Sequence, residues 1–241
     1  MTTRTSTPGR LERPWGSLHY EVVDLTPPWE VDPPVLVFHH GVGTDGGIWS
    51  AWLPLLADRY RLVRFDMAGF GRSSVPESGH AWSMEALAQD TLAVAAAAGA
   101  GRVHLVGESL GGTVALYLAA RHPAAVASLT VCNASHRGGS IQRVHEWRQF
   151  IAQHGMAAWS SMMMGLRFDA GRLPAPIWAW FERTQAAASA DTVLDLADLL
   201  VGTDLGADLG RIVAPAIFLA DRKSTRLNSS HIQKSRMPSS A

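Results

Sequence analysis

The sequence is poor in cysteine and has no long hydrophobic run. Cys132 is the only cysteine among 241 residues, which excludes an internal disulfide and leads us to expect a reducing, cytoplasmic location. No apolar run approaches the roughly 18 residues of a membrane-spanning helix. The polar residues 1–10 also lack the apolar core of a signal peptide. A formal net charge of zero gives no reason to expect nucleic acid or an anionic membrane as a partner.

Lysine is missing from almost the whole chain. Lys223 and Lys234 are the only lysines, and both lie in the last twenty residues, which hold five basic residues, six serines and no acidic residue. Removing those five from the 21 basic residues leaves 16 against 21 acidic ones. We expect residues 222–241 to be disordered and interpret them as foreign to this gene. A basic arm for an anionic partner and a plain solvated tail are the alternatives.

Short apolar runs alternate with helical patterns over much of the chain. Such alternation predicts an α/β fold, a mostly parallel, doubly wound sheet with helices on both faces. A weaker alternation over 18–23 predicts an edge strand. We expect buried strands at 35–39, 62–66, 103–106, 126–132 and 216–219, and helices at 48–57, 82–100 and 110–121.

The alternation stops between residues 133 and 212. This stretch is helical in pattern and rich in tryptophan, phenylalanine and methionine, so we interpret it as a helical cap lying over the strand ends. The expected organisation is a core over 1–136, a cap insertion over 137–210, a last core strand within 211–221 and the tail over 222–241.

A serine stands between an expected strand and an expected helix. Gly107-Glu108-Ser109-Leu110-Gly111 follows the run VHLV and opens the helix TVALYLAAR. A serine on such a tight turn exposes its hydroxyl, and the helix N-terminus supplies free N–H groups. We predict Ser109 as a nucleophile and the N–H of Leu110 as a donor to a developing oxyanion.

A glycine-rich loop follows the strand at 35–39. The His39-His40-Gly41 turn places the N–H of Val42 toward the nucleophile in enzymes built on such a turn, so Val42 is the second expected oxyanion donor. Both histidines are expected to be structural. The same loop reads G-x-G-x-x-G from Gly41 to Gly46, with Asp66 twenty residues beyond. That pattern also fits a dinucleotide site, so a nicotinamide-dependent oxidoreductase is a remote alternative.

Four segments of the chain, in order over roughly residues 15–220, together resemble the α/β-hydrolase superfamily. They are HHGVGTDGGIW, YRLVRFDMAGFGRS, VGESLGGTVALYLAARHP and SLTVCNAS. Within it the chain is most similar to 3-oxoadipate enol-lactonases and related lactone or ester hydrolases. The resemblance implies that Ser109 attacks the carbonyl of a small ester or lactone and forms an acyl-enzyme. No metal-ligand spacing is present, and we expect no metal and no cofactor.

A substrate that carries carboxylates would require a cation near the nucleophile. Arg137, Arg143 and Arg148 are the candidates from the sequence, with a solvated surface charge as the alternative for each. Trp147 is expected either to line the substrate pocket or to pack within the cap.

The catalytic acid and histidine should follow the serine in this fold. The acid is expected at position 224, which is Ser224, and Asp221 lies three residues too early. The only later histidine is His231, with no strand before it, while His136 and His145 come too early. We therefore expect a C-terminally truncated domain with impaired activity, and a non-catalytic chain is the alternative.

Overall fold

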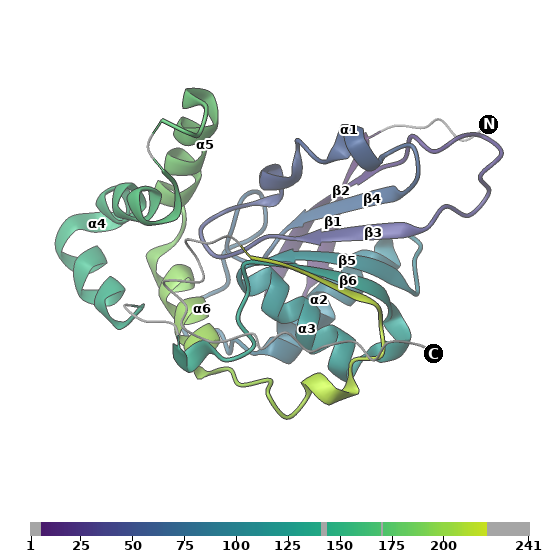
Figure 1. The fold of residues 1–241 in the computed structure, drawn as a ribbon. Coiled ribbons are helices and arrows are strands. Elements are labelled where there is room, and N and C mark those ends of the chain that lie inside the picture. Colours follow the sequence, from purple (N-terminus) through teal and green to yellow (C-terminus); the bar gives the residue numbers. More distant parts are fainter. Residues whose placement is uncertain (1–5, 141–143, 170, 221–241) are drawn as a thin grey trace.

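A computed structural model describes residues 6–140, 144–169 and 171–220. Its core is one seven-stranded sheet in the order β1-β2-β4-β3-β5-β6-β7 (Figure 1). Strands β4, β3, β5, β6 and β7 pair in parallel, whereas β1 and β2 pair antiparallel. The expected mostly parallel, doubly wound sheet is confirmed. Asp221, Ser224, His231, Arg143 and the tail over 222–241 lie outside the described residues.

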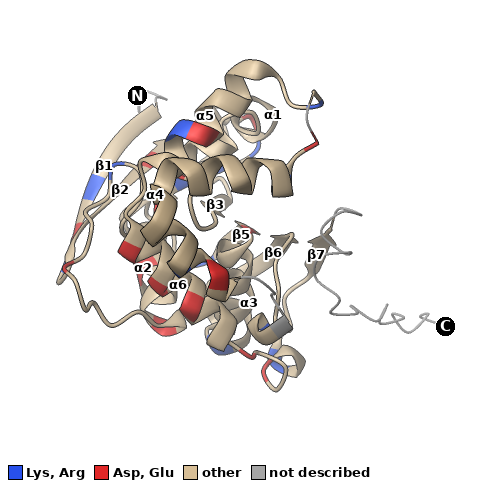
Figure 2. Ribbon diagram, turned by 90° about the vertical axis from the view of Figure 1, so that its left-hand side faces the viewer, with Lys and Arg blue, Asp and Glu red and all other residues tan. Residues whose placement is uncertain are grey.

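The first two strands correct one expectation. β2 (Gly16–Val23) was expected at the edge of the sheet, but β1 (Ser6–Arg13) pairs with it and takes that place (Figure 2). No residue of β1 is buried. The strand is therefore held by backbone pairing and leaves no apolar alternation in the sequence by which it could have been recognised.

The central strands match the expected apolar runs. All five residues of β3 are buried, as a strand covered on both faces requires. β7 is different, because Ile217 and Phe218 are each more than half exposed. The strands are β3 (Val35–His39), β4 (Arg61–Asp66), β5 (Val103–Glu108), β6 (Val126–Cys132) and β7 (Ala216–Leu219).

Two of the three expected core helices are present. α2 (Met84–Ala97) begins at Ser83, whose side chain accepts a hydrogen bond from the N–H of Ala86, and α3 (Leu110–Arg121) follows β5 directly. The prediction of one helix over 48–57 is wrong. It is broken into a 3₁₀ turn, η1, and a single helical turn, α1, because Pro54 has no N–H to continue a longer helix. Short 3₁₀ turns are η1 (Gly46–Trp49), η2 (Pro123–Ala125), η3 (Gly138–Ser140) and η4 (Leu209–Arg211), and α1 is Leu53–Leu56.

Three helices, which we call the cap helices, fill the stretch between β6 and β7. They are α4 (Val144–Arg167), α5 (Ala175–Ala186) and α6 (Ala190–Gly202). α4 is kinked at Gly155, whose φ of 77° is outside the helical range. α4 and α5 stand away from the sheet, while α6 returns beside α2 and α3 (Figures 1 and 2). Within the described ranges, no helix is long and apolar enough to cross a membrane.

Asp66 ties together the two loops that leave β3 and β4. Its side chain is buried, and its carboxylate accepts hydrogen bonds from the N–H of Gly46 and the N–H of Arg72, both at 2.8 Å. A Cβ on Gly71 would overlap this carboxylate. The loop between β3 and η1 is therefore fixed by a side chain at the end of the neighbouring strand.

We predict that Asp66→Asn lowers the free energy of unfolding by about 1–3 kcal/mol, because an amide replaces one of two buried acceptor oxygens with a donor. Chemical denaturation measures the change. Asp58→Asn is the matched control, since the Asp58 side chain is 70% exposed and its variant should be within about 0.5 kcal/mol of the parent. Equal effects of the two substitutions would contradict the role given to Asp66.

Candidate active site

Ser109 occupies a strained turn between β5 and α3. Its φ of 54° and ψ of −121° lie outside the regions that non-glycine residues favour. Among the described residues, only Asn133 is another non-glycine residue with positive φ. The Ser109 N–H donates to the carbonyl of Cys132 at 2.9 Å, which anchors the turn to β6. Such strain costs about 1–3 kcal/mol and is typical of active sites.

Three glycines allow the turn to pack this tightly. A Cβ on Gly107 would overlap the carbonyl of Gly111, and a Cβ on Gly111 would overlap the carbonyl of His39. A Cβ on Gly41 would lie 2.7 Å from the Cβ of Ser109. The loop after β3 is thus pressed directly against the serine turn. Val42 is the next residue of this loop, and its role as an oxyanion donor together with Leu110 stays a prediction.

The side chains of the two histidines before Gly41 form hydrogen bonds with the backbone. His40 is buried, its Nδ1 donates to the carbonyl of Gly41 at 2.8 Å, and its Nε2 accepts from the N–H of Met67 at 2.8 Å. His39 is also buried and its Nδ1 donates to the carbonyl of His40. Burial lowers the pKa of His39 to about 3 and also lowers that of His40. Both rings are therefore neutral, and His40 has no nitrogen left for proton transfer.

The dinucleotide interpretation of the same loop receives no support. Position 41 has no room for a side chain because Ser109 lies against it, and Gly46 lies against Asp66. The Asp66 carboxylate, which would have to bind a ribose, already accepts two backbone N–H groups. The pattern G-x-G-x-x-G is thus accounted for by the packing of this loop.

Two of the three cationic residues proposed from the sequence, Arg137 and Arg148, pair with exposed carboxylates instead. Arg137 pairs with Asp204 at 3.3 Å and Arg148 pairs with Asp198 at 2.9 Å, and these four side chains are all about 60% exposed. Trp147 packs against the fully buried Trp159, with ring centroids 5.3 Å apart, so it belongs to the packing of the cap helices.

Arg167 is the cation that sequence reasoning missed. It ends α4, where its Nη2 donates to the carbonyl of Val42 at 3.4 Å and its Nη1 donates to Gln185 at 3.3 Å. Burial lowers the pKa of Arg167, and the carboxyl of Glu108, beside Ser109, acts in the opposite direction. The only signal in the sequence is a lone arginine after the apolar run Met162–Met164, and nothing in that pattern points to Ser109.

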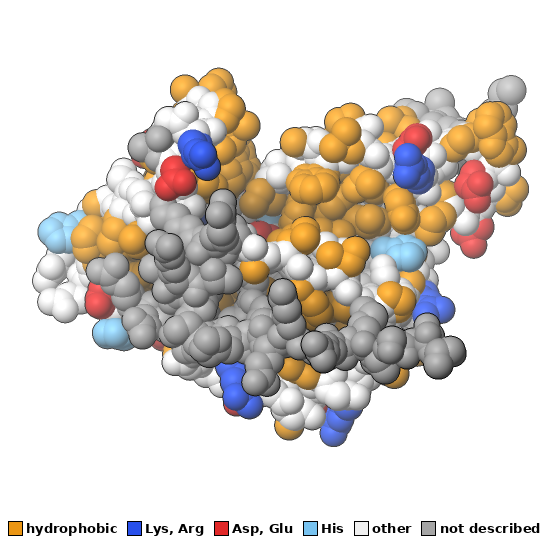
Figure 3. Space-filling view, in the orientation of Figure 1, with side chains coloured by type: hydrophobic (Ala, Val, Ile, Leu, Met, Phe, Trp, Pro, Cys, Tyr) orange, Lys and Arg blue, Asp and Glu red, His pale blue; other side chains and the backbone are white. Residues whose placement is uncertain are grey.

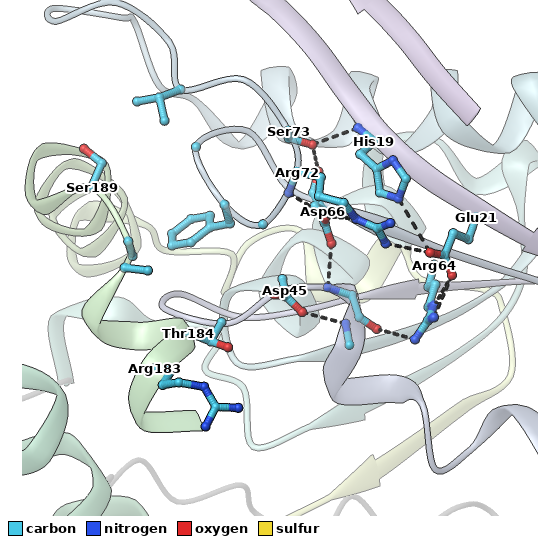
Figure 4. Close-up of a pocket in the computed structure, with 18 of the residues that line it drawn as sticks. His19, Glu21, Asp45, Arg64, Asp66, Arg72, Ser73, Arg183, Thr184 and Ser189 are labelled. Atoms are coloured by element: carbon cyan, nitrogen blue, oxygen red, sulfur yellow. Dashed lines mark hydrogen bonds and ion pairs between the residues drawn. The ribbon is translucent and has the colours of Figure 1, made fainter. Parts of the chain in front are cut away.

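A separate polar cavity of about 510 Å³ lies between β2, β4, the loops after β3 and β4, and the end of α5 (Figure 4). Ser109 is not among its lining residues. Glu21 lies between Arg64 and Arg72 and accepts from each at 2.6 Å. Because these charges satisfy one another, we place the chemistry at Ser109 rather than in this cavity.

The hydroxyl of Ser109 has no hydrogen-bond partner among the described residues. His136 lies in the loop between β6 and η3, and its carbonyl accepts from the N–H of Leu205. His145 is exposed at the start of α4. Over the same ranges, no group of three or more histidine, cysteine or acidic residues is placed to hold a metal ion.

The family model described as the alpha/beta hydrolase fold matches residues 34–193, which include β3, the serine turn, α4 and α5. The chain belongs to this family. The match covers about two thirds of the chain, and the strained serine between β5 and α3 lies within it. The resemblance noted in the sequence is therefore confirmed at the level of the family.

Several curated relatives are similar over less than half of this chain. A pimeloyl-[acyl-carrier protein] methyl ester esterase of Methylococcus capsulatus is 46% identical over 99 residues, which are 41% of this chain and 36% of that protein. A putative carbamate hydrolase RutD of Pantoea ananatis is 38% identical over 104 residues, 42% and 37% of the two chains. A 3-oxoadipate enol-lactonase of Acinetobacter baylyi is 34% identical over 102 residues, also 42% and 37%. The chain thus spans little more than a third of these relatives.

Solved structures share the fold over most of the chain. The enol-lactonase from Burkholderia xenovorans LB400 has a TM-score of 0.80 at 22% identity, covering 88% of this chain and 80% of that one. A hydrolase from Pseudomonas aeruginosa has a TM-score of 0.77 at 26% identity, covering 89% and 80%. At such identities the likeness supports the fold.

We predict that Gly111→Ala lowers the free energy of unfolding by about 1–3 kcal/mol, because the new methyl group meets the backbone of His39. Gly165→Ala is the matched control. Gly165 lies in α4 with open space around its Cα, and alanine there should stabilise the helix by up to about 1 kcal/mol. Denaturation of both variants measures the difference. A harmless Gly111→Ala would show that the serine turn is less tightly packed than described.

Proposed function

We propose that this chain derives from a serine hydrolase that cleaves a small carboxylic ester or lactone through Ser109. The observation that carries the proposal is the strained turn of Ser109 between β5 and α3, pressed against Gly41. The family match supports a hydrolase. The names of the relatives refer to the hydrolysis of an ester, a carbamate and a lactone. Each of these groups has a carbonyl carbon bonded to a second oxygen.

The chemistry follows from the position of the groups. The Ser109 oxygen attacks the carbonyl carbon, and its proton passes to a base. The N–H groups of Val42 and Leu110 stabilise the negative oxygen of the tetrahedral intermediate. The alcohol then leaves with a proton, and water hydrolyses the acyl-enzyme. No cofactor takes part in these steps.

The mechanism requires a general base that accepts the proton of Ser109. No histidine nitrogen in the described ranges is hydrogen-bonded to Ser109, and both histidines of the β3 loop are held neutral by burial. We therefore propose impaired turnover. A triad hydrolase without its histidine keeps roughly 10³–10⁴-fold catalysis over the uncatalysed rate through oxyanion stabilisation and binding. A chain that binds its ligand without turning it over is the second candidate, and the same observation favours it.

We predict that a fluorophosphonate adds slowly but selectively to Ser109, because the turn exposes the hydroxyl beside two oxyanion donors. Mass spectrometry of the digested protein locates the adduct. Ser109→Ala should abolish it, while Ser50→Ala, on an exposed residue after η1, should leave it unchanged.

The outcome that contradicts the hydrolase proposal is a chain that is folded by circular dichroism and carries no adduct on Ser109. An adduct without measurable hydrolysis of an activated ester would favour the second candidate, the binding chain.

A further inference from the structure

The polar cavity beside β2 and β4 is lined by one arginine that no carboxylate neutralises. Arg183 lies on α5, on the opposite side of the cavity from Arg64 and Arg72 (Figure 4). Arg64 and Arg72 each donate to Glu21 at 2.6 Å. The guanidinium of Arg183, in contrast, forms no hydrogen bond or ion pair with any described residue. All five of its N–H donors are therefore available to a ligand.

The carboxylates of the cavity are largely engaged already. Glu21 accepts from two arginines, and the buried Asp66 accepts from two backbone N–H groups. Asp45 is the third carboxylate of the lining, and its Oδ1 accepts from the N–H of Gly47 at 2.7 Å as the N-cap of η1. Its second oxygen accepts from none of the described residues. Asp45 is thus the carboxylate that would oppose an anion in this cavity.

Hydroxyl groups add further donors to the lining. Thr184, next to Arg183 on α5, forms no hydrogen bond within the part of the chain that the structure describes. Ser50 accepts from Arg64 at 2.7 Å and Ser189 accepts from the N–H of Thr192 at 3.4 Å, so each of these serines still has an O–H to donate. The lining therefore has more free donors than free acceptors, although its arginines and carboxylates are equal in number.

The placement of these donors favours a group with several acceptor oxygens. Arg183 and Thr184 lie on α5, Ser189 precedes α6, and Ser50 follows η1, so the donors come from different elements around the cavity. A phosphate monoester has three terminal oxygens that point in different directions and a charge of about −1.5 to −2 at neutral pH. A carboxylate has two oxygens in one plane and a single charge. The lining therefore suits a phosphate better than a carboxylate.

We propose that this cavity binds a small organic phosphate, with Arg183 as the main contact of the phosphate group. A volume of about 510 Å³ lies within the usual range of small-molecule sites and leaves room for an organic part beside Phe70, Ala187 and Ala188. Ser109 does not line the cavity, so the proposal does not depend on the hydrolase function. The bound phosphate would join α5 of the cap helices to the loops that leave β3 and β4.

The test is a calorimetric titration of the full chain at constant ionic strength with three ligands of similar size. Glycerol 3-phosphate carries the phosphate, D-glycerate carries a carboxylate in its place, and glycerol is neutral. Glycerol 3-phosphate should bind at least about tenfold tighter than glycerol and several-fold tighter than D-glycerate, because hydrogen bonds to a doubly charged group are the stronger ones. Inorganic phosphate should compete with it.

Variants of opposite sign locate the site. Arg183→Gln should weaken binding of glycerol 3-phosphate about tenfold or more, and Arg183→Lys should retain part of the affinity. Asp45→Asn should tighten binding several-fold, because it removes the opposing charge while the amide oxygen still caps η1. Arg148→Gln, in an exposed pair with Asp198, is the matched control and should leave the affinity unchanged.

Ser109→Ala separates this cavity from the active site and should bind glycerol 3-phosphate as the parent does. Loss of binding in this variant would place the anion at the serine turn and overturn the proposal. Equal affinities for the three ligands, or for glycerol 3-phosphate and D-glycerate, would also overturn it. So would an unchanged affinity in Arg183→Gln or Asp45→Asn that is folded by circular dichroism. Failure of fluorophosphonate labelling would count only against the hydrolase function.

Discussion

The close contact between the serine turn and the loop after β3 is the constraint on which the site depends. Gly41 meets the Cβ of Ser109, and Gly111 meets the backbone of His39, so the carboxyl ends of β3 and β5 can approach only where side chains are absent. This contact accompanies the positive φ of Ser109. The strain at one residue is offset by the packing of two parallel strands and α3.

The buried polar side chains around this contact also hold the loops of the site in place. Asp66 holds the loop after β3 through Gly46, and His40 holds the loop after β4 through the N–H of Met67. Both side chains have their bonding capacity used by backbone groups. Arg167, at the end of α4, donates to the carbonyl of Val42 in the same loop at 3.4 Å and to Gln185 at 3.3 Å.

Much of the core could be predicted from the sequence, because buried parallel strands leave continuous apolar runs such as those of β3 and β6. β1 could not, since a strand with no buried residue shows no alternation. The helix expected at 48–57 failed because the effect of Pro54 outweighed the apolar pattern. Ser109, Val42 and Leu110 were predicted from sequence motifs, and their catalytic roles stay predictions. Arg167 was not considered as a cation near the site, because its contacts depend on how the end of α4 packs against α5 and the loop after β3.

The space-filling view shows hydrophobic side chains gathered on the sheet face below α1 (Figure 3). Together with the exposed Ile217, Phe218 and Leu219 of β7, they show that the described core leaves apolar surface uncovered. In monomeric proteins large patches of this kind are uncommon. The serine turn itself lies at the end of β5, between this strand and α3.

The most direct test of the account is a crystal structure of the chain after reaction with a fluorophosphonate. The account predicts that the phosphonyl group is bonded to Ser109 and that its oxygen lies about 2.7–3.2 Å from the backbone nitrogens of Val42 and Leu110. Ser109 should keep a positive φ. A phosphonyl oxygen directed away from both nitrogens, or a Ser109 with helical backbone angles, would contradict the central claim that this turn presents a nucleophile to an oxyanion site.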